Sequence, residues 1–247
     1  MAAAMVKRLA LCMLLAASAA LAQAPPLIQF ETNSTPAAAA APGSATQVPV
    51  KADDVDRMTV PVRLGASRPL RFLVDTGADR TSVSVDIARE LGLAERPRAV
   101  LHSATGQSLV RMAHLPELSM SRRAVRNINA PLLEAEDIGA DGILGLDSLR
   151  SQKVVFDFAK DTLTILAANA PAAIEPGAIV VRARRRDGRL VITNALIDGD
   201  KVGVVLDTGA ALSIGNAAMR ARLTEKGLLK VVGPITLHSV TGQPLVG

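Results

Sequence analysis

Aromatic residues are scarce in this sequence. They make up 2% of its 247 residues, as four phenylalanines with neither tyrosine nor tryptophan. Proteins that hold single-stranded nucleic acid stack its bases on aromatic side chains, so this class of function is disfavoured. With 49% hydrophobic residues the chain can still build a core for one or two domains. That core must consist mainly of valine, leucine, isoleucine and alanine.

Cysteine is nearly absent, and the single one, Cys12, lies in a segment that we expect to be removed. A mature chain without cysteine has no disulfide, no zinc–thiolate site and no cysteine nucleophile. The sequence also contains no G-x-S-x-G, H-E-x-x-H or P-loop motif. Serine, metal-dependent and nucleotide chemistry therefore have no support, and we expect no cofactor and no metal.

A large excess of one charge is also missing. The formal net charge is +5, from 28 basic and 23 acidic residues. Lys7 and Arg8 lie in the predicted leader, which leaves 26 − 23 = +3 for the remainder of the chain. So small an excess does not indicate a polyanionic partner, and we expect no nucleic-acid partner.

Residues 1–22 have the pattern of a secretory signal peptide. Two basic residues precede a long apolar run, which ends in an A-x-A cleavage site at Ala20-Leu21-Ala22. The run is short for a helix that crosses about 30 Å of hydrocarbon, and no other stretch is long and apolar enough. We therefore expect an exported protein, periplasmic or secreted, with an uncleaved N-terminal anchor as the alternative.

Composition divides the rest of the chain into four parts. Residues 23–57 are rich in alanine, proline, serine and threonine, which indicates a disordered tether. Residues 58–168 have the pattern of short β-strands and form a first lobe. Residues 169–177 form a linker punctuated by proline, and residues 178–247 form a second lobe.

The two lobes are related in sequence. Residues 64–78 align without gaps to residues 196–210, and residues 101–110 align to residues 237–246. Each copy has a strand, a turn, an apolar strand, the letters DTGA, a short helix and a Thr-Gly hairpin in the same order. The first copy continues well beyond its hairpin, whereas the second ends just after Val246, so we expect the second lobe to be incomplete at its C-terminus.

The DTGA sequences are the strongest functional signal. Asp75 follows the apolar residues Phe-Leu-Val, and Asp207 follows Val-Val-Leu. A carboxylate at the end of a buried strand is costly unless it is hydrogen-bonded or used in chemistry. The glycine lets the backbone turn and donate an amide to the carboxylate, and the threonine supplies a hydroxyl that can fix the loop. A plain β-turn with an Asx-type hydrogen bond is the alternative to a functional role.

Two related lobes can bring one aspartate each to a pseudo-two-fold axis. Two carboxylates held close together cannot both ionise easily, so they share one proton. One of them can then remove a proton from water while the other, protonated, donates a hydrogen bond to a carbonyl under attack. This chemistry makes Asp75 and Asp207 the predicted catalytic pair.

With these motifs the chain resembles a retropepsin-like aspartic protease of the bacterial type, with two fused copies. DTGADRTSV and DTGAALSI resemble the active-site motif of that family, and residues 141–165 resemble its closing segment. The resemblance implies an all-β, pepsin/retropepsin-like fold of two related β lobes with short helices. It also implies an aspartic endopeptidase that hydrolyses peptide bonds with a water activated by the aspartate pair. Ser82 departs from the motif, which usually has an apolar residue there, and the second copy lacks an apolar-apolar-Gly segment.

The resemblance also assigns roles to residues around the pair. The active-site loops comprise Thr76, Gly77, Ala78, Thr208, Gly209 and Ala210. The flaps that cover the substrate comprise Ser103, Ala104, Thr105, Gly106, Ser239, Val240, Thr241 and Gly242. An apolar-apolar-Gly turn, Ile143-Leu144-Gly145, supports the first catalytic loop. The implied partner is an extended polypeptide substrate.

Two other functions remain open at this point. The chain could be an exported peptide-binding module with an inactive protease fold. Alternatively, Asp75 could pair with Asp75 of a second chain, which would require a homodimer. His102 and His238 occupy equivalent hairpin positions, where we expect solvent-facing side chains, and Asp147 is expected to orient a loop. The basic residues around Asp187-Gly188 indicate a β-hairpin with a solvated face.

Overall fold

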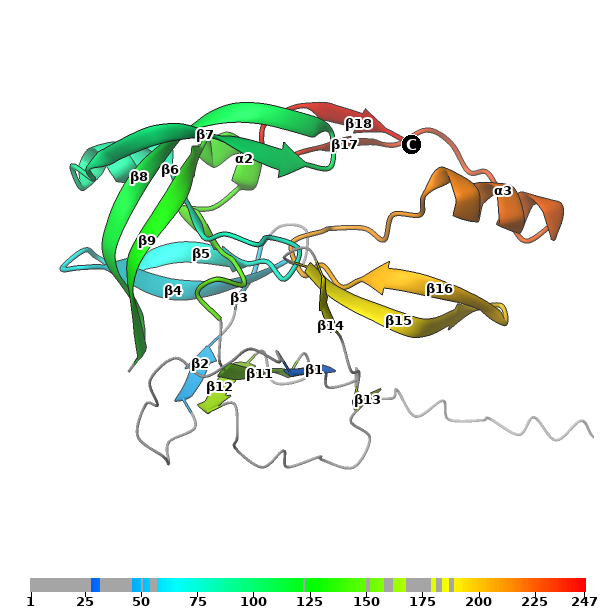
Figure 1. Ribbon diagram of the computed structural model, residues 1–247, viewed down its shortest axis with the longest axis horizontal. Coiled ribbons are helices and arrows are strands. Elements are labelled where there is room, and N and C mark those ends of the chain that lie inside the picture. Colours follow the sequence, from blue (N-terminus) through cyan, green and yellow to red (C-terminus); the bar gives the residue numbers. More distant parts are fainter. Residues whose placement is uncertain are drawn as a thin grey trace, which may run out of the picture.

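A computed structural model of the chain shows a mostly β architecture with short helices, which confirms the predicted fold class (Figure 1). The structure describes residues 28–31, 46–49, 51–53, 57–121, 123–149, 152–157, 162–167, 179–180, 184–186 and 189–247. The predicted leader (1–22) and the predicted linker (169–177) lie outside the described residues. Within the described parts of the chain, no helix is long and apolar enough to cross a membrane.

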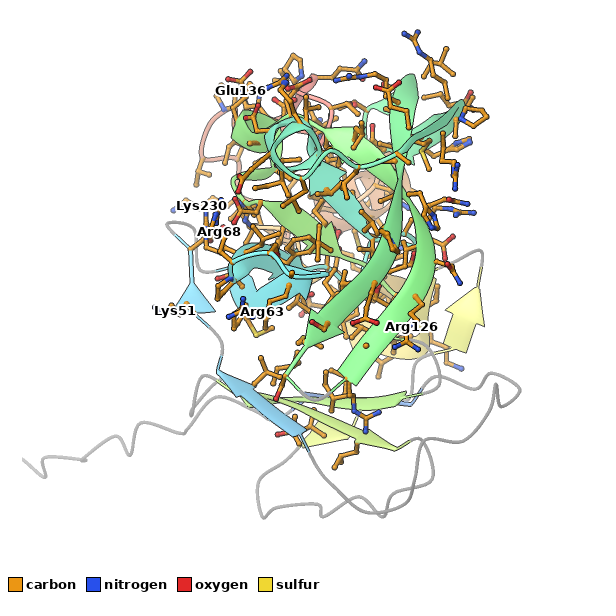
Figure 2. The ribbon with its side chains drawn as sticks, turned by 90° about the vertical axis from the view of Figure 1, so that its left-hand side faces the viewer. Lys51, Arg63, Arg68, Arg126, Glu136 and Lys230 are labelled. Atoms are coloured by element: carbon orange, nitrogen blue, oxygen red, sulfur yellow. The ribbon has the colours of Figure 1, made fainter. Side chains whose placement is uncertain are left out.

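The first copy forms an eight-stranded sheet in the order β3-β4-β5-β10-β6-β9-β8-β7. Its strands are β3 (Lys51–Ala52), β4 (Met58–Leu64), β5 (Leu70–Val74), β6 (Ser82–Ser84), β7 (Glu95–Ser103), β8 (Gly106–Met120), β9 (Arg123–Leu133) and β10 (Gly142–Leu144). β4 also pairs with the end of β8, which folds the sheet around one core. In Figure 2 the labelled side chains of Arg63, Arg68 and Arg126 project from the surface of these ribbons.

Aliphatic side chains fill this core, as the composition predicts. Val62 and Leu70, on paired strands β4 and β5, are 0% and 1% exposed. Phe72, one of the four aromatic residues of the chain, is 0% exposed in the same cluster. A buried aliphatic or phenylalanine side chain contributes about 1.5–3 kcal/mol relative to an exposed one. Apolar burial therefore holds the strands together. It also fixes the position of Asp75, which directly follows β5.

β10 belongs to the C-terminal part of the first copy but lies between two of its N-terminal strands. It pairs parallel with β5 and antiparallel with β6. Glycine is needed here, because a Cβ at Gly142 would lie 2.6 Å from the carbonyl oxygen of Ser82. A Cβ at Gly145, just after the strand, would lie 2.6 Å from the carbonyl oxygen of Arg80. The predicted apolar-apolar-Gly segment is thus packed against the backbone that leads away from Asp75.

Equivalent caps begin the helices that follow the two DTGA loops. α1 (Val85–Glu90) starts at Ser84, whose Oγ accepts from the backbone N–H of Ile87. α3 (Ala217–Glu225) starts at Asn216, whose Oδ1 accepts from the N–H of Met219. Side-chain caps of this kind are typical helix start signals. α2 (Ala135–Ile138) is a single turn that the sequence analysis does not predict.

Residues 23–57, for which the sequence predicts a tether, include three short strands in their described parts. β1 (Ile28–Glu31) and β2 (Thr46–Pro49) join a five-stranded sheet with β11 (Gln152–Asp157), β12 (Thr162–Ala167) and β13 (Ile179–Val180), in the order β13-β1-β11-β12-β2. β3 pairs with β4 and so joins the eight-stranded sheet. Short segments such as these become strands because distant partners pair with them, and composition does not show this.

The side chains of the second copy are more exposed than those of the first. β14 (Arg184–Arg186), β15 (Arg189–Ile197) and β16 (Asp200–Val205) form one antiparallel sheet, and β17 (Thr236–His238) pairs with β18 (Pro244–Val246). Figure 1 shows β17 and β18 beside the tip of the β7–β8 hairpin. Most of the exposed large apolar side chains lie in this copy, among them Val231 at 77% and Val232 at 90%.

The close packing of Gly145 leads to a prediction about stability. Gly145→Ala should lower the free energy of unfolding by about 1–3 kcal/mol, because the new methyl group forces the backbone of Arg80 and Thr81 to move. Gly203→Ala is the matched control, since no heavy atom lies within 4 Å of a Cβ at that strand position. Urea unfolding of both variants measures the difference, and equal stabilities would refute the packing role of Gly145.

Candidate active site

The two DTGA loops meet face to face. They follow β5 and β16, and they join through reciprocal hydrogen bonds between two threonines (Figure 1). Thr76 Oγ1 donates to the carbonyl oxygen of Leu206 at 2.7 Å, and Thr208 Oγ1 donates to that of Val74 at 2.7 Å. Each hydroxyl also accepts from the backbone N–H of the other threonine at 3.1 Å. Thr76 and Thr208 are 132 residues apart, which is the offset of the sequence repeat.

Each aspartate of the predicted pair is held by its own loop. Asp75 Oδ1 accepts from the N–H groups of Gly77 at 2.7 Å and Ala78 at 3.0 Å. Asp207 Oδ1 accepts from the two equivalent amides, those of Gly209 and Ala210, at 2.9 and 3.0 Å. Hydrogen bonds to a charged acceptor are stronger than neutral ones. In each loop Oδ1 is thus occupied, and Oδ2 receives no hydrogen bond from the loop amides.

The glycines let the two carboxyl groups approach each other. A Cβ at Gly77 would lie 2.5 Å from Cγ of Asp207, and a Cβ at Gly209 would lie 2.5 Å from Cγ of Asp75. Real Cβ atoms do not come this close to a neighbour, so any side chain at either position would displace the opposite carboxyl group. Each aspartate therefore sits over the glycine of the other copy, in hydrogen-bond contact with the other aspartate.

The two carboxyl groups have unequal surroundings. Asp75 is buried, with 9% of its surface exposed, whereas Asp207 is exposed. Burial, followed by the negative charge of Asp207, raises the pKa of Asp75 to about 7, and the amides of Gly77 and Ala78 act in the opposite direction. Asp75 therefore keeps its proton up to near-neutral pH.

The predicted support segment contacts the first catalytic loop directly. Leu144 O accepts from the N–H of Asp75 at 3.1 Å, and the N–H of Gly145 donates to Thr81 Oγ1 at 3.1 Å. Asp147 orients this loop, as expected, because its Oδ1 accepts from the N–H and the hydroxyl of Thr81. Ile143 and Leu144 are 2% and 0% exposed, so they anchor the segment in the core.

Ser82, the departure from the family motif, is also buried. It is 2% exposed, and its hydroxyl has no hydrogen-bond partner in the described part of the chain. An unsatisfied buried hydroxyl costs about 1–3 kcal/mol. The structure offers no compensating contact for it.

The predicted flap residues lie in two hairpin tips with the same internal bonds. Ser103 Oγ lies 3.0 Å from Thr105 Oγ1, and Ser239 Oγ lies 2.9 Å from Thr241 Oγ1. The tips also contact each other, because Thr105 Oγ1 donates to Oε1 of Gln243 at 2.8 Å. Ala104 and Gly106 complete the first tip, and Val240 and Gly242 complete the second.

The second tip also reaches the first copy. Val240 packs against the small apolar cluster of Leu73 and Ile143, which Ala78 also contacts. A Cβ at Gly242 would meet the carboxylate of Asp137 at 2.8 Å. The second tip therefore packs against the same cluster as the loop of Asp75. Gln243 and Asp137 were not predicted, and only the repeat of Thr-Gly-Gln in both hairpins points to the glutamine.

His102 and His238 are exposed at equivalent positions of β7 and β17, as expected. In the described segments no group of three or more histidine, cysteine, aspartate or glutamate residues could hold a metal ion.

The reciprocal threonine contacts predict a large effect of removing either hydroxyl. Thr76→Val and Thr208→Val each leave a carbonyl oxygen and an amide of the opposite loop without a partner, so each should lower the free energy of unfolding by about 1–3 kcal/mol. Thr→Ser at the same positions keeps the hydroxyl and should cost less. Thr224→Val, which removes an exposed hydroxyl from α3, is the control in urea unfolding. If the three valine variants lose equal stability, the threonines do not join the copies.

Comparisons with known proteins bear on the first copy. Residues 60–151 match the model of the family described as "gag-polyprotein putative aspartyl protease". The search of curated proteins returned no match.

Two crystal structures show related chains at low similarity. A retropepsin-like aspartic protease from Rickettsia conorii is 19% identical, with a TM-score of 0.37, over 49% of this chain and 91% of that chain. An aspartic proteinase from Irpex lacteus is 15% identical, with a TM-score of 0.34, over 53% of this chain and 49% of that chain. The family match includes Asp75, the first flap and the support segment, whereas Asp207 lies outside it. Residues 60–151 are thus similar to a retropepsin-like aspartyl protease domain.

Proposed function

We propose that the chain is an aspartic endopeptidase in which Asp75 and Asp207 together activate one water molecule. The observation that carries this proposal is the pairing of two carboxyl groups from equivalent loops of one chain, with the pKa of Asp75 raised to about 7. Two coupled carboxyl groups that hold one proton between them are suited to acid–base catalysis of hydrolysis. The match of residues 60–151 to an aspartyl protease family supports the same class of reaction.

The unequal burial of the two aspartates supports different roles for them, one as proton donor and one as base. Protonated Asp75 donates a hydrogen bond to the scissile carbonyl, while ionised Asp207 takes a proton from the water. The water oxygen then bonds to the carbonyl carbon, and the carbonyl oxygen receives the proton of Asp75. In the second half of the reaction the proton on Asp207 passes to the amide nitrogen, and Asp75 takes back a hydroxyl proton. The C–N bond breaks, which yields a carboxylic acid and an amine.

The substrate in this proposal is an extended polypeptide. The tips of the two flap hairpins lie within hydrogen-bond distance of each other, and the strands behind them offer backbone groups for pairing with a bound chain. An extended peptide also presents one carbonyl at a time to the aspartate pair. We further infer that the protein acts after export, in the periplasm or outside the cell, because residues 1–22 have the pattern of a signal peptide.

The decisive test is substitution of each aspartate by asparagine, which has nearly the same shape and cannot ionise. Asp75→Asn and Asp207→Asn should each lower the turnover of an unstructured protein substrate by roughly a thousandfold or more. The double variant should lose little beyond a single one, because the two groups act as a unit. Ser82→Ala, which alters a buried residue of the same loop outside the pair, is the control for general damage to the loop.

The other two functions give different results in that experiment. If Asp75 pairs with Asp75 of a second chain, Asp207→Asn is nearly silent and activity falls steeply on dilution. If the chain only binds peptides, the parent protein cleaves nothing and neither substitution changes its affinity. Activity that a chelator or a serine-directed reagent abolishes would contradict an aspartate mechanism.

The raised pKa of Asp75 predicts that turnover and folding stability both decrease as the pH rises. Turnover should fall as the pH rises through about 7, because Asp75 loses the proton that it donates. Folding stability should also fall from pH 3.8 toward 7, since the folded state retains a proton that the unfolded state releases. In Asp75→Asn the corresponding slope of urea-unfolding free energy should disappear. A slope that is unchanged in this variant would assign the effect to another group.

A further inference from the structure

A cavity of about 360 Å³ lies beside the first catalytic loop. Its walls include Leu101 of β7, Val110 and Met112 of β8, Pro131 of β9, and two arginines, Arg80 and Arg96. This volume is within the usual range for small-ligand sites and can hold a side chain of a bound peptide. The catalytic mechanism above makes no use of it.

The cavity is connected to the aspartate pair by direct packing. Leu101 and Val110, from opposite strands of the flap hairpin, pack against the small apolar cluster that Ala78 also contacts. The N–H of Ala78 donates to Oδ1 of Asp75 at 3.0 Å. Arg80 follows two residues later in the same loop. A peptide that lies across the pair and under this flap would therefore bring one of its side chains to the cavity.

Charge distinguishes this cavity from an ordinary apolar pocket. Arg80 and Arg96 both line it, both are exposed, and no aspartate or glutamate is among its lining residues. Neither guanidinium has a hydrogen bond or an ion pair with the described residues. By contrast, Arg126 contacts Glu117 at 2.8 Å and Arg89 contacts Asp86 at 2.9 Å. Two unneutralised cations at one cavity favour an anionic ligand, because guanidinium groups bind carboxylates with paired hydrogen bonds.

The second copy carries different residues at both positions. The alignment of the DTGA loops places Leu212 where the first copy has Arg80. Continuing the ungapped hairpin alignment five residues before Leu101 places Val232, which precedes β17, opposite Arg96. Leu212 is 47% exposed and Val232 is 90% exposed, so both are available to a ligand. Five residues after its aspartate, the first loop therefore carries a cationic side chain, and the second loop carries an aliphatic one at the same position.

We infer that the Arg80–Arg96 cavity selects an acidic substrate side chain, aspartate or glutamate, on one side of the scissile bond, and that an apolar side chain is preferred on the other. This inference rests on the proposed peptidase function and deepens it. The carboxylate would lie near the two guanidinium groups, with its aliphatic carbons against the apolar walls. Charge attraction at an exposed site is screened by salt, so the preference should weaken as ionic strength rises.

The test uses a set of unstructured peptides that differ at one position near the cleaved bond, as glutamate, glutamine or lysine. The full chain should cleave the glutamate peptides with a kcat/KM at least about tenfold above glutamine, and lysine should be worst. Arg80→Leu and Arg96→Val, which insert the residues of the second copy, should each reduce this ratio, and the double variant should abolish it. Arg126→Gln is the matched control, because Arg126 is an exposed arginine of β9 that does not line the cavity.

Binding to the uncleaving Asp75→Asn chain separates this inference from the peptidase proposal. Tighter binding of glutamate peptides without cleavage by the parent would uphold the cavity and refute the peptidase. Cleavage or binding that does not distinguish glutamate, glutamine and lysine would overturn the inference and leave the peptidase intact. A glutamate preference that survives in the double arginine variant would also overturn it, as would the absence of both binding and cleavage. Thermal melting confirms that each variant is folded.

Discussion

The reciprocal hydrogen bonds of Thr76 and Thr208 are the contact on which the site depends. Each hydroxyl donates to a carbonyl at the end of the opposite apolar strand and accepts from the opposite threonine amide. These four bonds fix the distance between two loops that lie 132 positions apart in the chain. At that distance each carboxyl group sits over the glycine of the other loop. The pairing of the aspartates, the raised pKa and the proposed chemistry all follow from this one junction.

The same loop sequence lies in two different environments, and we propose different roles for the two aspartates on this ground. Around Asp75, the carbonyl oxygen of Leu144 in β10 accepts from the N–H of Asp75, and Asp147 accepts from the N–H of Thr81 in the same loop. Burial then makes ionisation of Asp75 costly. Asp207 has equivalent amide bonds in a more exposed loop, which is why we propose it as the base. The residues outside the motif extend the asymmetry to the substrate, with Arg80 on one side and Leu212 on the other.

The sequence predicts those elements that occur in both copies or that have a local pattern of apolar residues. Two DTGA loops, two hairpins and an apolar-apolar-Gly segment can be located by eye, and so can the short helix that follows each loop. Other features depend on long-range contacts. β1 and β2 become strands only because β11 and β12 pair with them. The arginine-lined cavity needs three strands and a loop to come together, so no short motif marks it. α2 lacks a side-chain cap at Glu134, which removes the usual sequence signal for its start.

The central claim is that Asp75 and Asp207 of one chain share a proton, and carboxyl titration measures it most directly. The protein would be labelled with ¹³C at the aspartate side-chain carboxyls, and the two resonances would be assigned with the single Asp→Asn variants. We expect Asp75 to stay protonated to about pH 7 in the parent and to titrate at lower pH in Asp207→Asn, where the neighbouring charge is gone. An Asp75 resonance that titrates near 3.8 in both proteins would contradict the account, because the two carboxyl groups would then be independent.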